Sequence, residues 1–155
     1  MLPLLPPIPD LVLSLRRLID QVPRGRVTTP GTLASALGNP IAARWIGHYL
    51  LHHDHDAGCV CHRVIRAGGA LGPYPEGSQE KVRRLSAEGV EMAADHGYMV
   101  PGVDLERYGY GDFTSDRPLA KLADYQNRLA AKVSLRRARK VPRLVGGVDV
   151  SYISP

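Results

Sequence analysis

The sequence predicts a mainly α-helical fold, built around a helix-turn-helix and followed by a separate C-terminal helix and strand. Three observations predict it. Helix-capping residues precede several short runs in which apolar residues recur at spacings of three and four. Two of these runs are joined by a tight Gly-Asn-Pro turn at residues 38–40. A β-branched apolar run, "RLVGGVDVSY", follows Pro142 and is typical of a strand.

The first predicted helix begins after Asp10, whose carboxylate is suited to cap it. Apolar residues recur along one face of this helix at Leu11, Leu15, Leu18 and Val22. The segment "VPRGRV" at 22–27 ends the helix, because proline and glycine interrupt the pattern.

The helix-turn-helix comes next. Thr29 is suited to cap a helix that begins at Pro30 and ends before Gly38. Asn39-Pro40 repeats the start signal, and a second helix is predicted over 41–53. Other packed helix pairs share this pattern, so the pattern alone leaves DNA binding as one of several interpretations.

The rest of the chain divides into less regular pieces. Residues 67–78 form a Gly/Pro-rich loop without the spacing of a phosphate-binding loop. A short helix is predicted from Ser78 to Leu85, ending near Gly89, and an irregular linker over 93–116. A last helix follows Pro118, before the strand already described. The predicted organisation is therefore a domain over 1–92, the linker, and a further segment over 117–155.

Composition limits the class of protein. The 155 residues are enough for one domain and a fragment, with 44% hydrophobic and 23% charged residues, as in ordinary folded proteins. No apolar run is long enough to span a membrane. The N-terminus holds four prolines in nine residues without a basic region, which indicates an extended arm. Cys59 and Cys61 are too close for an ordinary structural disulfide, which favours a reducing cytoplasm.

Positive charge is concentrated near the C-terminus. Residues 117–143 hold nine Lys or Arg and one acidic residue, Asp124, whereas the net charge of the whole chain is only +5. Such a run is either a solvated helix face or a nucleic-acid contact, and charge alone does not separate the two.

The candidate reactive group is Cys61, in "VCHRV". The thiolate is the reactive form of cysteine, and the neighbouring His62 and Arg63 can favour it. A buried cysteine acting as a small apolar residue is the alternative.

The stretch from "VPRGRVTT" through "GNPIAARWIG", "CHRV" and "GALGPY" to "EKVRRLSAEGV" resembles O6-alkylguanine-DNA alkyltransferases over about residues 8–92. "VCHRV" keeps four residues of that family's Pro-Cys-His-Arg-Val motif. The resemblance implies a winged-helix-like helix-turn-helix domain that binds double-stranded DNA in the minor groove and rotates an O6-alkylguanine out of the stack.

The resemblance also implies the roles of particular residues. Cys61 would accept the alkyl group once per molecule, with His62, acting through a water, and Glu88 removing the thiol proton. The residues implied to contact DNA are Thr29, Pro30, Ala43, Arg44 and Gly47. Arg44 would fill the gap left by the flipped base, and Gly47 would lie where the recognition helix nears the DNA. The residues implied for the alkyl pocket are His53, Val60 and Tyr74. No metal or organic cofactor is expected, and the protein is expected to act as a monomer.

Three positions depart from the family pattern. Pro30 replaces a tyrosine that helps rotate the nucleotide, His53 replaces an asparagine that braces the active-site histidine, and Val60 replaces the proline before the cysteine. The alternative function is therefore a module that recognises alkylated DNA without transferring the group. A third class is a metal-binding structural protein, in which His48 and His52, four residues apart, would share a zinc ion with Cys59.

The C-terminal stretch "LADYQNRLAAKVSLRRARKVPRLVGGVDVSY" resembles the N-terminal part of endonuclease V over about residues 117–153. Asp149 matches a carboxylate that binds the catalytic Mg²⁺ in an intact nuclease domain. A complete sheet and further carboxylates are needed for that site, so no nuclease activity is expected from this segment alone.

Overall fold

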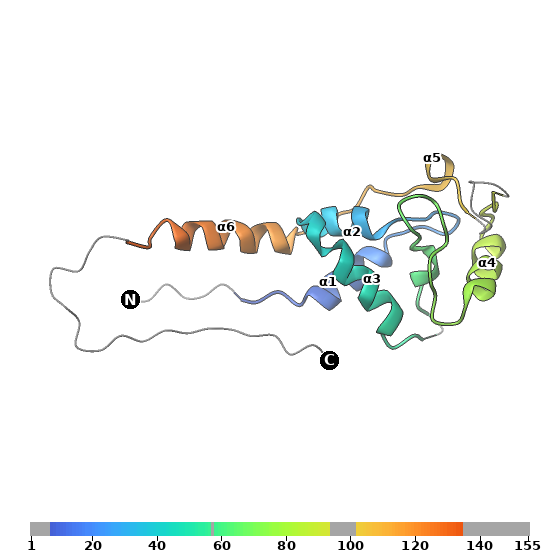
Figure 1. The fold of residues 1–155 in the computed structure, drawn as a ribbon, viewed down its shortest axis with the longest axis horizontal. Helices are drawn as coiled ribbons and strands as arrows, with labels where there is room; N and C mark the ends of the chain where they lie inside the picture. The colour runs from blue at the N-terminus through green and yellow to red at the C-terminus, as the bar shows by residue number, and fades with distance from the viewer. Residues whose placement is uncertain (1–6, 57, 94–101, 135–155) are drawn as a thin grey trace.

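The computed structural model describes residues 7–56, 58–93 and 102–134. Short helical segments build this part of the chain (Figure 1). They are α1 (Leu11–Ile19), α2 (Pro30–Leu37), the 3₁₀ turn η1 (Pro40–Ala42), α3 (Ala43–His52), the 3₁₀ turn η2 (Cys61–Arg63), α4 (Ser78–Ala87), α5 (Leu105–Tyr108) and α6 (Pro118–Ala130). Within the described ranges, β pairing is limited to isolated bridges. None of the described helices is long and apolar enough to cross a membrane.

The predicted caps begin the first two helices. The Asp10 carboxylate accepts a hydrogen bond from the Leu13 amide at 2.8 Å, and the Thr29 hydroxyl accepts one from the Thr32 amide at 3.1 Å. Each bond satisfies an amide that has no partner inside its helix. Gly38 ends α2 at φ +97°, a left-handed conformation that glycine adopts without strain. The predicted start and end of α2 are therefore confirmed.

The second helix of the pair begins two residues later than predicted. Asn39 caps the turn, since its side-chain oxygen accepts from the Ile41 amide at 3.0 Å. Pro40 then opens the 3₁₀ turn η1, and regular α-helix starts only at Ala43. A proline at the start suits such a tight first turn, because it has no amide hydrogen to place.

Two apolar clusters hold the fold together. The first joins α1, α2 and α3 through Leu15, Leu18, Ile19, Leu33, Ala34, Leu37, Ile46 and Val64. The second lies under α4 and the loops, and contains Val27, Ile65, Leu71, Leu85, Val90, Val103 and Tyr108. Adjacent residues Val64 and Ile65 belong to different clusters, so the chain just after Cys61 is fixed on both sides.

The described part of the predicted linker differs from the expectation. Val103 and Tyr108 are buried in the second cluster, and Asp104 caps α5 between them. The backbone of this segment also pairs with Val27, whose amide donates to the Tyr108 carbonyl at 2.9 Å and whose carbonyl accepts from Tyr110 at 2.7 Å. Residues 102–113 therefore pack onto the first domain, through the buried side chains of Val103 and Tyr108 and the backbone pairing with Val27.

Helix α6 extends away from the rest of the described chain, as Figure 1 shows. Its first turn is attached: Leu119 packs against the first cluster, and Ala120 lies against Gly38. Beyond this turn its side chains are mostly exposed. The predicted strand after Pro142 lies outside the described residues.

Candidate active site

Cys61 is the first residue of η2, and its side chain is buried. Two backbone hydrogen bonds hold the turn next to the start of α2. The Thr28 amide donates to the Arg63 carbonyl at 2.9 Å, and the Ile65 amide donates to the Thr28 carbonyl at 2.9 Å. Both cysteine thiols of the chain are free. The candidate nucleophile therefore lies on a short turn whose position is fixed by the segment before the helix-turn-helix.

Glu88, the C-cap of α4, connects this turn to the rest of the domain. Its carboxylate accepts from His62 Nε2 at 2.9 Å and from the Gly25 amide at 3.2 Å. Arg63 donates to both carboxylate oxygens, at 2.8 and 3.0 Å. Burial opposes ionisation of Glu88, but these donors, Arg63 foremost, outweigh it and hold the pKa of the carboxyl at about 2. Glu88 is therefore charged at neutral pH.

His62 is placed to act as a base. Burial lowers the pKa of the imidazole, and the Glu88 carboxylate only partly offsets this, so the neutral form is favoured. With Nε2–H donating to Glu88, Nδ1 carries the lone pair. This Nδ1 is buried and has no partner within the described residues. A neutral imidazole with a free, buried acceptor can receive a proton from a nearby thiol, directly or through a water.

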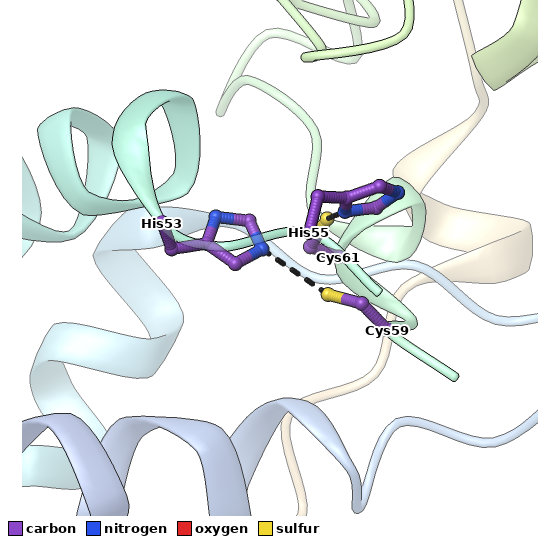
Figure 2. A group of neighbouring side chains, drawn as sticks. All are labelled: His53, His55, Cys59 and Cys61. Carbon is purple, nitrogen blue, oxygen red and sulfur yellow. Dashed lines mark hydrogen bonds between the residues drawn. The ribbon is translucent and has the colours of Figure 1, made fainter. Parts of the chain in front are cut away.

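The direct partner of the Cys61 thiol is a different histidine. Cys61 Sγ lies 3.4 Å from His55 Nδ1, while His55 Nε2 lies 3.0 Å from the Tyr74 hydroxyl. His53, which replaces the asparagine of the family pattern, contacts the other thiol, with Nε2 3.2 Å from Cys59 Sγ (Figure 2). The alternating spacing of "HHDHDAGCVC" was the available signal for His55 and Cys59 as site residues.

The pKa values of the two thiols are shifted in opposite directions. Hydrogen bonding to Cys59 and burial both raise the pKa of the Cys61 thiol. The hydrogen bond from the Cys61 thiol lowers the pKa of the Cys59 thiol to about 4, and His53 contributes less. Burial of Cys59 acts in the opposite direction but is outweighed. Cys61 is therefore protonated at neutral pH and needs a base before it can attack a carbon atom.

Cys61 opens into a pocket of about 230 Å³ between α1, the end of α3 and the following loop. The residues lining the pocket are Arg16, Ile19, Asp20, Tyr49, His53, Asp54, Asp56, Gly58, Cys59 and Cys61. Of the predicted alkyl-pocket residues, only His53 lines this pocket. Tyr74 is buried, and its hydroxyl contacts His55, the partner of the Cys61 thiol. Val60 packs against the first apolar cluster.

Most of the residues predicted to contact DNA lie at the two helix starts, and Gly47 lies midway along α3. Thr29 is buried as the cap of α2, Pro30 is its first residue, and Ala43 begins α3. Arg44 is exposed, and a Cβ atom added at Gly47 would meet nothing within 4 Å. A second pocket of about 230 Å³ includes Pro30 and Gly47 in its lining. Helix α3 therefore presents both an exposed cation, Arg44, and an open backbone surface at Gly47.

The zinc site considered for His48, His52 and Cys59 does not form. His48 and His52 stack on each other at 4.2 Å between ring centroids, and both are exposed on α3. Within the described chain, the one group able to share a metal ion contains neither of them. One helical turn brings two histidines together, but Cys59 faces the other way, toward His53.

A helix-turn-helix beside a buried cysteine, whose neighbouring histidine is hydrogen-bonded to a glutamate, defines a DNA-binding domain of the alkyltransferase class. Residues 13–90 match the family described as 6-O-methylguanine DNA methyltransferase, DNA binding domain. The chain belongs to this family.

The chain is similar to several known proteins. A bifunctional methyltransferase/endonuclease of Picrophilus torridus is 40% identical over 143 residues, which cover 92% of this chain and 46% of that protein. The Escherichia coli DNA base-flipping protein is 33% identical over 59% of this chain and 67% of its own length. The crystal structure of S. pombe ATL in complex with DNA has a TM-score of 0.58 at 25% identity, covering 65% of this chain and 94% of that one. The chain thus spans about half the length of the bifunctional relatives it matches.

Proposed function

We propose that this protein repairs DNA by transferring an alkyl group from O6 of guanine to its own Cys61. The observation that carries the proposal is the hydrogen bond between His62 and Glu88, directly after a buried cysteine on an anchored turn. Family membership supports the same reaction. The cysteine sulfur is the acceptor, so the reaction needs no organic cofactor and each molecule reacts once.

DNA would bind across the α2–α3 pair in a winged-helix-like manner. Arg44 would enter the minor groove, and the bare backbone at Gly47 would let α3 approach the phosphates closely. The DNA-bound structure of S. pombe ATL, which the described chain resembles, supports this mode of binding. We infer that the target is an O6-alkylguanine in duplex DNA, bound by one copy of the chain in the cytoplasm.

The transfer step is a displacement at the alkyl carbon. His62 Nδ1 would take the thiol proton through a water, while Glu88 stabilises the imidazolium that forms. The Cys61 sulfur would then form a bond to the alkyl carbon as the bond from that carbon to O6 breaks. The electrons of the broken bond would pass to the guanine, which would take up at N1 a proton equivalent to the one that the thiol released, leaving an ordinary guanine and a thioether on the protein.

The C-terminal segment belongs to a second activity in this proposal. The match to the bifunctional methyltransferase/endonuclease of P. torridus covers 92% of the chain, which supports an endonuclease V-like part starting near residue 117. Asp149, the residue expected to bind Mg²⁺ there, lies outside the described residues.

Intact-protein mass spectrometry tests the transfer. The full chain is mixed with a short duplex containing O6-methylguanine, and with the same duplex containing guanine. We expect a mass gain of one methyl in place of one hydrogen, only with the methylated duplex, and peptide mapping that assigns it to Cys61 rather than Cys59. Cys61→Ala should show no gain. Tight binding of the methylated duplex without a mass gain would instead establish recognition without transfer.

A further inference from the structure

Four side chains at the candidate active site converge to form a group of which the transfer reaction requires only Cys61, as its nucleophile. They are His53, His55, Cys59 and Cys61, and one nitrogen or sulfur atom from each lies within 4.8 Å of all the others. We propose that these residues bind a Zn²⁺ ion with tetrahedral Cys₂His₂ coordination. Figure 2 shows the two pairs from which the site is built.

The geometry is close to that of a metal-bound set. Zinc bonds of about 2.3 Å to sulfur and about 2.0 Å to nitrogen place tetrahedral ligand atoms about 3.4–3.8 Å apart. His53 Nε2 and Cys59 Sγ are already 3.2 Å apart, and His55 Nδ1 and Cys61 Sγ are 3.4 Å apart. Only the separation between the two pairs needs to shrink, by about 1 Å, to reach these values.

The outer nitrogen of each imidazole is already hydrogen-bonded in the way metal-binding histidines require. His53 Nδ1 lies 3.1 Å from the Leu50 carbonyl, which can only accept, so Nδ1 carries the proton and Nε2 faces Cys59 as a lone pair. His55 Nε2 lies 3.0 Å from the Tyr74 hydroxyl, which in turn donates to Glu76. Such outer contacts fix the tautomer and raise the basicity of the metal-binding nitrogen.

The donor set selects the kind of cation. Two thiolates neutralise a divalent ion, and a mixed sulfur–nitrogen tetrahedron suits Zn²⁺ rather than Mg²⁺ or Ca²⁺, which prefer oxygen ligands. The carboxylates of Asp20, Asp54 and Asp56 line the same pocket and outnumber its one arginine, Arg16. The negative charge of these carboxylates therefore attracts a cation into the pocket.

The site shares one atom with the proposed repair reaction. Zinc would hold Cys61 as a thiolate, and alkylation would convert that thiolate into a thioether, a poor ligand for zinc. This consequence rests on the proposed function: alkyl transfer should weaken zinc binding, whereas zinc binding itself needs no DNA.

Metal analysis of the full chain tests the proposal. The reduced protein is purified, freed of metal with a chelator, loaded with Zn²⁺ and desalted before elemental analysis. We expect one zinc per chain, and visible absorption bands of tetrahedral Co²⁺ with sulfur-to-cobalt charge transfer when cobalt replaces zinc. His53→Ala and Cys59→Ser should lose both signals. The matched controls His48→Ala and His52→Ala remove exposed histidines outside the cluster and should keep both.

A second measurement uses the native sequence and therefore does not depend on whether the variants fold. Zinc should protect both thiols from alkylation by iodoacetamide, and excess chelator should restore their reactivity. Glu76→Gln, which alters the outer contact to Tyr74 and His55 and also removes an ion pair with Arg84, should weaken zinc binding about 10-fold. Substoichiometric zinc on the native chain, or full zinc retention in Cys59→Ser, would overturn the proposal. The methyl-transfer assay is run on protein freed of metal, so its outcome tests the proposed function independently of zinc binding.

Discussion

Replacing Glu88 with glutamine should destabilise the protein at neutral pH and much less in acid. The carboxylate accepts hydrogen bonds from His62, Arg63 and Gly25, and the Arg63 and Glu88 side chains are only 13% and 11% exposed. Glutamine keeps the shape but removes the charge, which leaves a nearly buried guanidinium without its counter-ion.

The magnitude follows from the pKa of Glu88. A carboxyl group that titrates at about 2 in the folded protein, against 4.5 ordinarily, adds about 3 kcal/mol to the free energy of unfolding at neutral pH. Removing one partner of a buried ion pair costs about 3–5 kcal/mol, so the two values agree at the lower end. Because the folded pKa is depressed, this stability is present above about pH 4.5 and lost as the pH falls toward 2.

Urea unfolding of the wild-type and Glu88→Gln proteins measures this contribution. The difference between them should be about 3 kcal/mol at neutral pH and less than half of that at about pH 3. Glu91→Gln is the matched control, because Glu91 also pairs with an arginine, Arg107, but at a 70% exposed position where solvent screens the pair. An equal cost of Glu88→Gln at both pH values would refute the assignment of the stability to the ion pair.

Three further predictions test individual parts of the fold by thermal or urea unfolding. Gly38→Ala should lower the free energy of unfolding by at least about 2 kcal/mol, because φ is +97° and the new Cβ would lie 2.7 Å from Ala120. Gly47→Ala, on open helix surface, is the control and should be neutral or slightly stabilising. Similar losses in the two variants would contradict this reasoning. Thr29→Ala should cost about 1 kcal/mol through loss of the α2 cap, and no cost would show that water replaces it. Burial lowers the pKa of Lys81 to about 8, so wild-type stability should rise between about pH 8 and pH 10.5 relative to Lys81→Met, and parallel pH profiles would exclude this.

Part of the fold was predictable because its signals act over a few residues. The caps at Asp10, Thr29 and Asn39 are made by side chains that bond to amides two or three positions away. Gly38 ends α2 through its own backbone conformation. Such contacts need no knowledge of the remaining chain, so the helix starts could be placed closely from the sequence.

Other features depend on residues far apart in the chain. The packing of 102–113 onto the domain relies on Val103 and Tyr108 meeting a cluster that begins at Val27. That segment is irregular and rich in Gly, Tyr and Asp, so its sequence predicts a linker. The two-residue delay before α3 has a local cause instead, because Pro40 opens a 3₁₀ turn that has the same start signals as an α-helix.

The sequence by itself predicted the helix pair, Cys61 as the candidate reactive group and, through its resemblance to a family, the pairing of His62 with Glu88 that the structure contains. Only the tertiary structure decided which histidines reach the thiols. His48 and His52 share a helix face, yet His53 and His55 face the two thiols, because α3 ends at His52 and the chain then turns back toward η2. The direction of a side chain after a helix ends is set by packing, and spacing along the chain does not contain it.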